Sequence, residues 1–450
     1  MGTRGEILIS SGFWKLYLWK NGIWPAIHEL EQFQGLSPAA ARQDLAARLL
    51  TLVQYFGGRE DTLPEWREAA RIRDADQLWE LWPSLPITTK NDLVTRFVPP
   101  AEIPRRFGLE GRVNCSGGST GEPTHFFQDT GMIRAGTAAT LFCRMRLGWR
   151  PGMPLISMWG ADRDLGKAGP SEYEQRMARL RNDWVIAGYK VDESTVDRFL
   201  GLLRRRHPAA VFGYTSILEF VARRVLERGE QVPPGWVRTA WNGAEMMFES
   251  QSELFRRAFG VPLLNWYGSR ELSVVAHQRR SPGPLEIVRP HMLIELVNGA
   301  SKPASAGEAA RLVVTCTVCR GTPFIRYEIG DMGTFAARDQ DESGLRALAT
   351  LEGRNAGLLT LANGKVINSL FWNQIFKEFA EIHQFQVMVC REPGLELRFI
   401  GEGMAAEREA SLRRVLENFT TTIPVRIVWM ERLPVTRQGK LVQVVHEAAT

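Results

Sequence analysis

The first hundred residues show the hydrophobic pattern of helices. Apolar residues recur at intervals of three and four over 45–53, and the same spacing returns around Trp79. Such spacing places them on one face of a helix. Residues 85–93, which follow several prolines, have the pattern of a loop that leads into a helix. Either Thr88 or Thr89 can cap that helix, because a threonine hydroxyl accepts a hydrogen bond from the first turn.

From residue 105 onward, short apolar runs alternate with amphipathic stretches. The runs predict buried strands at 211–214, 237–241, 261–266 and 311–318, and stretches between some of them predict helices at 217–228 and 250–259. Strands that alternate with helices are typical of a parallel sheet with helical crossovers. We therefore expect an α/β fold with mixed or parallel sheets in the main part of the chain.

The pattern changes after Gly353. Helices are predicted at 370–381 and 405–419, and strands at 385–390, 395–400 and 425–429. This order is typical of a small α+β domain. We therefore expect a large N-terminal domain over 1–356 and a small C-terminal domain over 357–450.

Composition and charge exclude several classes of protein. The chain has 450 residues, 44% hydrophobic and 24% charged, which fits neither a disordered nor a fibrous protein. No apolar run is long enough to span a membrane and no signal series opens the sequence, so we expect a cytoplasmic protein that binds no membrane. The net charge of +6 is scattered, which disfavours nucleic acid as a partner. Monomer and homodimer both stay open.

The five cysteines are too few for a disulfide framework and indicate a reducing compartment. Cys316 and Cys319 have the spacing of half a zinc site, but such a site needs about four ligands and no second pair follows. Buried strand cysteines are the favoured interpretation, and zinc at this pair stays open.

One loop is rich in glycine and hydroxyl groups. It consists of Ser116, Gly117, Gly118, Ser119, Thr120 and Gly121. Glycines let backbone N–H groups turn into a concave nest, and hydroxyls add donors without bulk, so the loop is suited to a polyphosphate. A solvent-exposed turn explains the same composition, and the Gly-Lys-Ser/Thr end of a P-loop is absent.

Further polar clusters follow in a fixed order, some of them directly after a predicted strand. They are 242–245, 267–271, 326–331, 353–354 and 436–440. Tyr267 offers a ring on which a base can stack, and Glu271 places a carboxylate near the end of a strand. Asp331, beside a glycine, is suited to bind the two hydroxyls of a ribose.

This ordered set resembles the core motifs of the adenylate-forming superfamily, which contains acyl-CoA synthetases, luciferases and the adenylation domains of peptide synthetases. Segments 85–90, 213–216 and 382–386 are similar to the phenylacetate-CoA ligase branch, with its capsule-biosynthesis and coenzyme F390 synthetase-like members. The resemblance implies an enzyme that uses ATP and Mg²⁺ to convert a carboxylic acid into an acyl-adenylate and then passes the acyl group to coenzyme A. It also implies that the C-terminal domain is a mobile lid.

The resemblance implies roles for the charged and phosphate-binding residues. Thr120 and the rest of the loop 116–121 correspond to residues that hold the β- and γ-phosphates of ATP. Glu271 corresponds to the carboxylate that binds Mg²⁺. Lys440 is similar to the lid lysine that reaches the substrate carboxylate and the α-phosphate. These roles are electrostatic, because the reaction brings two anions together and releases pyrophosphate.

Nucleoside and acid contacts follow from the same resemblance. For the nucleoside, the resemblance implies that Tyr267 and Gly268 contact the adenine. It implies that Asp331 binds the ribose with the help of Arg354. The adenine and acyl pocket would be lined by Gly243, Ala244 and Glu245. The contacts for the acid are Tyr214, Thr215, Trp241, Asn242 and Trp266. Their aromatic rings favour a flat aromatic acid, although tryptophans at strand ends are often ordinary core residues.

Two positions depart from the family pattern. Glu122 places a negative charge beside the phosphate loop, and 355–357 lacks the expected hinge aspartate, although Gly357 can still act as a pivot. Two alternatives therefore stay open: transfer of the acyl group to an amine, as in an amide synthetase, and a catalytically impaired nucleotide-binding partner in a biosynthetic cluster. Each charged site residue, taken alone, also fits an ordinary helix-end or turn role.

Overall fold

The chain forms two compact units in a computed structural model. The structure describes residues 4–116, 124–159, 172–187, 191–299, 301–305, 307–336, 347–352, 359–360, 366–367, 372, 375–376, 379, 381–390, 394–420, 423–434 and 444–446. The first unit comprises Met1–Ile329 and Gly333–Leu351, and the second comprises Gly330–Met332 and Glu352–Thr450. The expected functional boundary at 356/357 lies outside the described residues.

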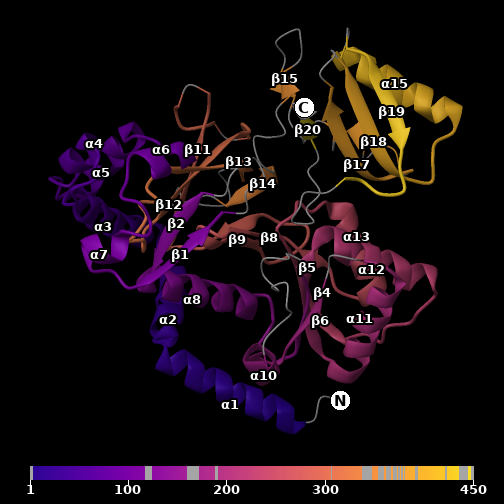
Figure 1. Cartoon of the computed structure of the whole chain (residues 1–450), viewed down its shortest axis with the longest axis horizontal. Helices are drawn as coiled ribbons and strands as arrows, with labels where there is room; N and C mark the ends of the chain where they lie inside the picture. Colours follow the sequence, from indigo (N-terminus) through magenta and orange to yellow (C-terminus); the bar gives the residue numbers. More distant parts are fainter. Residues whose placement is uncertain are drawn as a thin grey trace. The chain divides into compact units, whose positions relative to one another are not determined.

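The N-terminal part is helical, as its periodicity predicts (Figure 1). Its helices are α1 (Arg4–Lys20), α2 (Ile23–Gln34), α3 (Pro38–Gly57), α4 (Pro64–Ala69), α5 (Ala75–Leu81), the 3₁₀ turn η1 (Trp82–Ser84), α6 (Lys90–Thr95) and α7 (Ile103–Phe107). Thr89 is the N-cap of α6 and forms a capping box with Asp92. Thr88 is buried instead, and its hydroxyl donates to the carbonyl of Ile325 at 2.8 Å.

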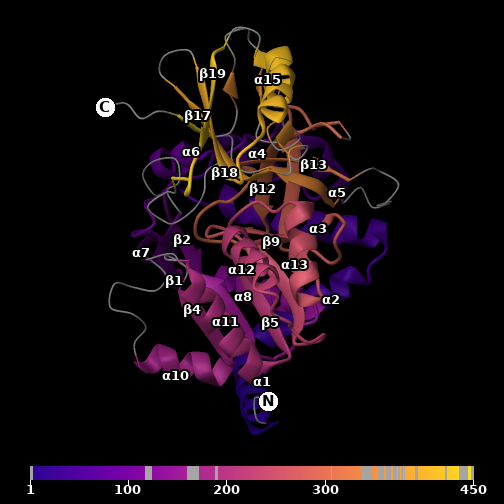
Figure 2. The same cartoon turned by 90° about the vertical axis from the view of Figure 1, so that its right-hand side faces the viewer.

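A five-stranded parallel sheet forms the second part of this unit, in the order β4-β3-β5-β6-β7. Its strands are β3 (Leu155–Trp159), β4 (Asp183–Ala187), β5 (Ala209–Tyr214), β6 (Val237–Gly243) and β7 (Leu263–Leu264). The helices of this region are α10 (Glu172–Arg181), α11 (Glu193–Arg206), α12 (Thr215–Glu227) and α13 (Glu249–Phe259). Figure 2 shows α11, α12 and α13 side by side along one face of the sheet. The predicted parallel sheet with helical crossovers is confirmed.

A seven-stranded sheet, in the order β11-β12-β13-β14-β10-β9-β8, lies beside the parallel one. Its strands are β8 (Trp266–Ser269), β9 (Ser273–Gln278), β10 (Leu285–Ile287), β11 (Met292–Val297), β12 (Ala310–Cys316), β13 (Tyr327–Phe335) and β14 (Leu348–Glu352). A hairpin of β1 (Gly111–Cys115) and β2 (His125–Asp129) stands apart. Predicting one strand over 261–266 was wrong, because the chain breaks at Asn265 and passes from the parallel sheet into this one.

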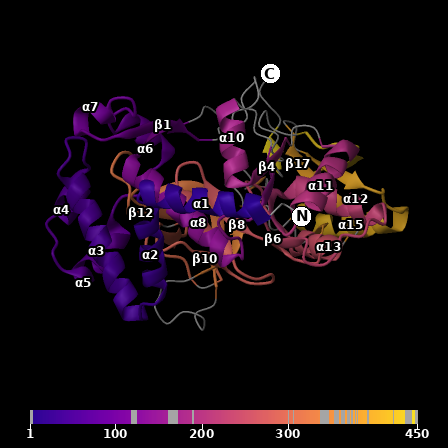
Figure 3. The ribbon, with the colours of Figure 1, turned by 90° about the horizontal axis from the view of Figure 1, so that it is seen from below.

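Helix α8 (Thr130–Arg146) packs between the two sheets. Ala138 and Phe142 share one hydrophobic cluster with Ala210 and Trp241 of the parallel sheet and with Val274 of β9. On its outer side α2 packs along α8, and α1 contacts α10 (Figure 3). Because small alanines let α8 approach both sheets closely, its burial holds the end of β6 next to the start of β8.

The second unit is a small α+β structure. It consists of β15 (Leu359–Thr360), β16 (Val366–Ile367), β17 (Ile382–Val389), β18 (Leu395–Gly401), α15 (Ala406–Thr420), β19 (Val425–Trp429) and β20 (Val444–His446), with a four-stranded sheet in the order β19-β18-β17-β20. Phe385, Phe399 and Leu412 lie in its core. The expected fold class, a large α/β domain followed by a small α+β domain, is confirmed. The predicted helix 370–381 falls mostly outside the described residues.

Within the described part of the chain, no helix has both the length and the hydropathy that a membrane crossing requires. Cys316 and Cys319 are buried free thiols, as predicted, but only Cys316 lies on a strand, because β12 ends there. Nowhere among the described residues do three or more His, Cys, Asp or Glu side chains gather to hold a metal, so nothing there completes a zinc site at this pair.

Candidate active site

The carboxyl ends of the central parallel strands lie at one edge of the sheet. In the strand register, Met158 pairs with Gly213, and Tyr214 pairs with Gly243. Strands β3, β5 and β6 therefore end together, at Trp159, Tyr214 and Gly243. In open α/β sheets this edge is where ligands bind. Four of the five residues predicted to contact the acid lie here, on β5, β6 and the start of α12.

An aromatic row runs along this edge. The ring centroids of Tyr214 and Trp159 lie 4.4 Å apart, and those of Trp159 and Phe212 lie 5.1 Å apart. The ring centroids of Phe212 and Trp241 lie 6.0 Å apart, and so do those of Trp241 and Trp266. Trp241 is fully buried, whereas Trp159, Phe212 and Trp266 are half-buried. The row can therefore contact a ligand through its half-buried members, and Trp241 supports it from behind.

Trp159 and Phe212 were not predicted from the sequence as site residues. Trp159 ends a short apolar run, Leu155 to Trp159, and that position in a parallel strand was the available signal. Gly243 makes the close packing possible, because a Cβ atom there would lie 2.7 Å from the Phe212 ring and 3.2 Å from the Trp159 ring. Any larger side chain would displace these rings.

Asn242 ties the two sheets and a helix together. Its Nδ2 donates to the hydroxyl of Thr215 and to the carbonyl of Glu245, each at 2.9 Å. Its Oδ1 accepts from the backbone N–H of Trp266 at 2.8 Å. With no exposed surface, the Asn242 side chain acts on a ligand through the elements it positions, which are the starts of α12 and β8.

Glu245 has a structural partner that the sequence did not reveal. Its carboxylate accepts hydrogen bonds from the backbone N–H and the hydroxyl of Ser216, at 2.8 and 3.0 Å. It thereby satisfies the first turn of α12, where the N-cap residue Tyr214 provides no side-chain cap. Ala244, between Gly243 and Glu245, is exposed and has a φ of 63°, a left-handed conformation that costs energy for a non-glycine residue.

Glu271 lies in the turn between β8 and β9 and is only 4% exposed. Among the described residues its carboxylate has no hydrogen bond or ion pair. A buried carboxylate without a partner is costly, and a bound cation would offset that cost. Gln128 of β2 donates to the carbonyl of Arg270 at 3.0 Å and so fixes the turn next to Glu271. A carboxylate oxygen is the kind of ligand that a hard cation such as Mg²⁺ prefers.

Tyr267 and Gly268 precede this turn on β8. Tyr267 is 7% exposed and takes part in the core of the first unit. A Cβ atom at Gly268 would lie 2.4 Å from the carbonyl oxygen of Ser273, so the hairpin requires glycine at this point. Both predicted adenine contacts are thus close in sequence to Glu271 and held by a tight hairpin.

The predicted phosphate loop lies at the tip of the β1–β2 hairpin. The Ser116 N–H donates to the Thr124 carbonyl, and the Thr124 N–H donates to the Ser116 hydroxyl, each at 2.9 Å. This double contact closes the base of the loop. Gly117, Gly118, Ser119, Thr120 and Gly121 lie outside the described residues, and so do Glu122, Arg354, Gly357 and Lys440.

Asp331 lies on β13, in the seven-stranded sheet that also carries Tyr267. The start of β13 is anchored by Arg326, which forms an ion pair with Glu295 at 3.0 Å and donates to the carbonyl of Pro83 at 2.7 Å. Burial raises the pKa of Glu295, although Arg326 and the indole N–H of Trp82 both bind its charged form. This buried pair fixes the strand that presents Asp331. Its approach to Glu271 stays a prediction.

The chain is similar in sequence to known proteins at low identity, and no family model matches it. It is 24% identical to the protein CapK of Staphylococcus aureus over 221 residues, which are 48% of this chain and 46% of CapK, so the match spans about half of that relative. It is 22% identical to the phenylacetate-coenzyme A ligase of Thermus thermophilus over 398 residues, 80% of this chain and 85% of the ligase.

The fold is also that of a solved acyl-CoA ligase. The structure of 2-hydroxyisobutyryl-CoA ligase in the postadenylation state matches with a TM-score of 0.66 and 17% identity, over 91% of this chain and 90% of that one. The fold inferred from the ordered motifs is therefore confirmed, and the two sequence relatives agree with the branch. In sequence and in fold, the chain is therefore similar to the phenylacetate-CoA ligase-like branch of the adenylate-forming superfamily.

Proposed function

We propose that this protein uses ATP and Mg²⁺ to activate a carboxylic acid as an acyl-adenylate and then transfers the acyl group to coenzyme A. The observation that carries the proposal is Glu271, a nearly buried carboxylate that has no partner within the described part of the chain. Its place in the turn after β8, the strand whose first residue contacts Asn242, suits a metal that neutralises phosphate oxygens. The similarity to a phenylacetate-coenzyme A ligase supports the same chemistry.

Each site residue then has an electrostatic or positioning role. Glu271 holds the Mg²⁺, which lowers the cost of bringing the acid to the α-phosphate. The loop 116–121, with Thr120, donates to the β- and γ-phosphates as pyrophosphate leaves. Lys440 balances the charge between the attacking carboxylate and the α-phosphate. Residues 1–356 bind ATP and the acid, and 357–450 carry Lys440 as a lid.

Nucleoside binding is assigned to the strands next to the metal turn. Tyr267 and Gly268 lie against the adenine, while Asp331 binds the ribose hydroxyls with the help of Arg354. Gly243 and Ala244 form the rim between the nucleoside and the acid, and Glu245 supports that rim through Ser216. The left-handed backbone of Ala244 supports this assignment, because strain of this kind gathers at ligand sites.

An aromatic acid is the substrate class that the aromatic row supports best. Trp159, Phe212 and Trp266 are half-buried and lie at the edge where the acyl group would bind. Flat rings that stack on one another offer a planar ligand a matching surface. A long aliphatic chain would gain less from such a surface.

Pyrophosphate exchange tests the first half of the proposal. ATP and labelled pyrophosphate are incubated with the protein and a panel of aryl and aliphatic acids. We expect exchange that depends on the added acid and on Mg²⁺, with aryl acids the most active. ATP binding without exchange for any acid would contradict the proposal and would favour the impaired nucleotide-binding partner.

Product analysis tests the second half. With an active acid, we expect a thioester when coenzyme A is present and no amide when amines replace it. Amide formation without thioester would assign the protein as an amide synthetase. Either product would leave the adenylation step in place, so the two halves of the proposal are tested separately.

A further inference from the structure

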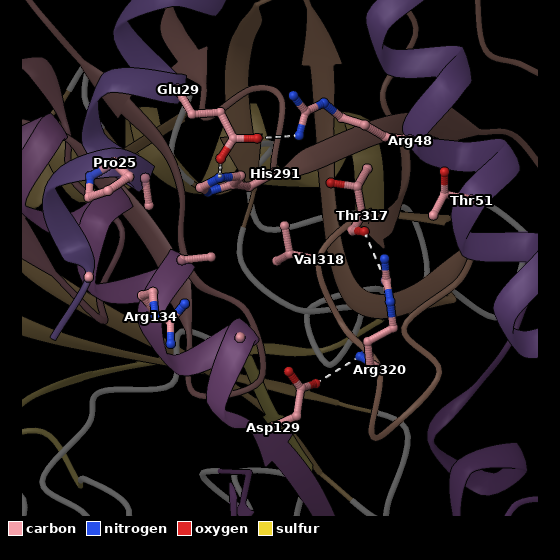
Figure 4. Close-up of a pocket in the computed structure, with 14 residues that line it drawn as sticks. Pro25, Glu29, Arg48, Thr51, Asp129, Arg134, His291, Thr317, Val318 and Arg320 are labelled. Carbon is pink, nitrogen blue, oxygen red and sulfur yellow. Dashed lines mark hydrogen bonds and ion pairs between the residues drawn. The ribbon is translucent and has the colours of Figure 1, made fainter. Parts of the chain in front are cut away.

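A cavity lies in the first unit, among α2, α3, α8 and the turn after β12 (Figure 4). Its volume is about 680 Å³, which is within the range of small-molecule sites. None of the residues given a role in adenylation lines it. A ligand bound in this cavity would therefore be independent of the proposed function.

The acidic groups of this cavity already have partners within the protein. Glu29 accepts a hydrogen bond from Arg48, and His291 and Arg48 together lower the pKa of Glu29 to about 2. Asp129 accepts backbone N–H donors from Met132 at 2.9 Å and from Arg320 at 2.7 Å. Both carboxylates are therefore held by groups of the protein, and neither is left to attract a cation.

Two arginines of the cavity lack an acidic partner. Arg134, on α8, has no hydrogen bond or ion pair with any residue that the structure describes. Arg320 donates from its side chain to the carbonyls of Thr317 and Cys319, at 3.2 and 2.7 Å, and to no carboxylate in the described ranges. Figure 4 shows Arg134 and Arg320 on opposite sides of Val318. Two guanidinium charges are thus left to attract an anion.

His291 adds a buried group that calls for a partner. It is 1% exposed, and neither ring nitrogen has a hydrogen bond among the described residues. Its charged partner is Glu29, whose Oε2 lies 3.6 Å from Nε2, an ion-pair distance (Figure 4) that is too long for a hydrogen bond. A buried polar group without a hydrogen bond destabilises the fold. A ligand oxygen in the cavity would remove that destabilisation.

We propose that this cavity binds a small organic anion, whose carboxylate or phosphate group lies between Arg134 and Arg320 and receives a hydrogen bond from His291. The apolar part of the ligand packs on Pro25, Ala135 and Val318, which line the same cavity. Guanidinium groups bind both kinds of oxyanion through paired N–H donors, so the oxyanion is the shared chemistry.

Calorimetric titration of the full chain tests this proposal. The probes are inorganic phosphate and succinate, which separate a phosphate ligand from a carboxylate ligand. We compare the unchanged protein with Arg134→Gln and Arg320→Gln, and use Arg105→Gln on α7 as the control, because Arg105 is exposed and lies outside the cavity. Glu271→Gln is added to separate this cavity from the candidate active site.

We expect at least one probe to bind, with affinity falling roughly tenfold or more in Arg134→Gln and Arg320→Gln. Arg105→Gln and Glu271→Gln should bind as the unchanged protein does. Equal affinity in all five proteins, or no binding of either probe, would overturn the proposal. If Arg320→Gln unfolds because its carbonyl contacts are lost, Arg134→Gln decides alone, since Arg134 has no described partner to lose.

Discussion

Substitution of Glu271 is expected to affect activity and stability in different ways. In Glu271→Gln the side chain keeps its shape and loses its charge. Because no described residue pairs with this carboxylate, we expect the free energy of unfolding to stay the same or rise. Acid-dependent pyrophosphate exchange should fall by about 10²-fold or more, since a metal contact is lost. A variant that loses stability and keeps its exchange rate would make Glu271 a structural residue.

Asn242 shows how a buried amide can position a site without touching the ligand. In Asn242→Ala, three hydrogen bonds to Thr215, Glu245 and Trp266 are lost. We expect the free energy of unfolding to fall by about 2–4 kcal/mol, because buried donors and an acceptor are left unsatisfied. Urea unfolding measures this. Asn21→Ala is the matched control, since Asn21 is exposed and makes one side-chain contact. Equal losses in both variants would contradict the positioning role of Asn242.

Individual contacts of this kind were the hardest to predict from the sequence. Glu245 was expected to line the pocket, yet its carboxylate binds Ser216, which is 29 residues away. Such a pairing depends on two strands ending at the same edge, and local sequence does not contain that information. The N-cap role of Thr89 could be predicted from the sequence, because its capping box with Asp92 lies within four residues.

At the scale of elements, the aromatic row depends on a glycine. In Gly243→Ala, the new Cβ atom would lie 2.7 Å from the Phe212 ring. We expect a loss of about 1–3 kcal/mol in unfolding free energy and a higher KM for the acid, because the row must shift. Gly12→Ala on α1 serves as the control, since nothing lies within 4 Å of its Cβ position. A neutral Gly243→Ala variant would show that the row adjusts freely.

Strand β9 carries a pH-sensitive group. Burial lowers the pKa of His277 to about 3, and the charges of Arg146 and Arg279 contribute. Between pH 6.5 and about 3 the unfolded chain therefore binds the proton that the folded His277 excludes, so this residue destabilises the fold as the pH falls. In His277→Leu, unfolding free energy should decrease less on acidification from pH 7 to about pH 4 than in the unchanged protein. Identical pH profiles, measured by urea unfolding, would contradict this.

Element types were largely predictable, and sheet membership was not. Short, mostly apolar runs predicted β5, β6 and β12, because buried strands need no polar face. The run 261–266 was expected as one strand, but the chain crosses between sheets at Asn265. The apolar residues on both sides of Asn265 fit either sheet. At this crossing the Trp266 N–H donates to Asn242, which is 24 residues away in the sequence, so local sequence does not predict the contact.

At the scale of the whole molecule, the proposed two-step reaction predicts that Lys440 is needed for adenylation and not for thioester formation. In Lys440→Ala, acid-dependent pyrophosphate exchange should fall by about 10²-fold or more, because the charge at the α-phosphate is lost. Thioester formation from a supplied acyl-adenylate and coenzyme A should stay near the rate of the unchanged protein. Equal losses in both half-reactions would contradict the assignment of Lys440 to the first step.

The order of the motifs indicated the fold, although each motif is weak alone. The motifs 242–245 and 267–271 lie at or next to strand ends, so their order reflects the topology of the fold. The shape of the acid site depends on side chains that meet only after folding, such as Trp159 and Phe212. The sequence therefore predicts a class of acid and no individual acid.

The most direct test of the proposed function is an experimental structure of the protein with ATP, Mg²⁺ and an acid that supports exchange. We predict an acyl-adenylate at the carboxyl ends of β3, β5 and β6, with its acyl group against Trp159 and Phe212. Glu271 should lie within the coordination shell of the metal. A nucleotide bound away from these strands, or a metal with no contact to Glu271, would contradict the central claim.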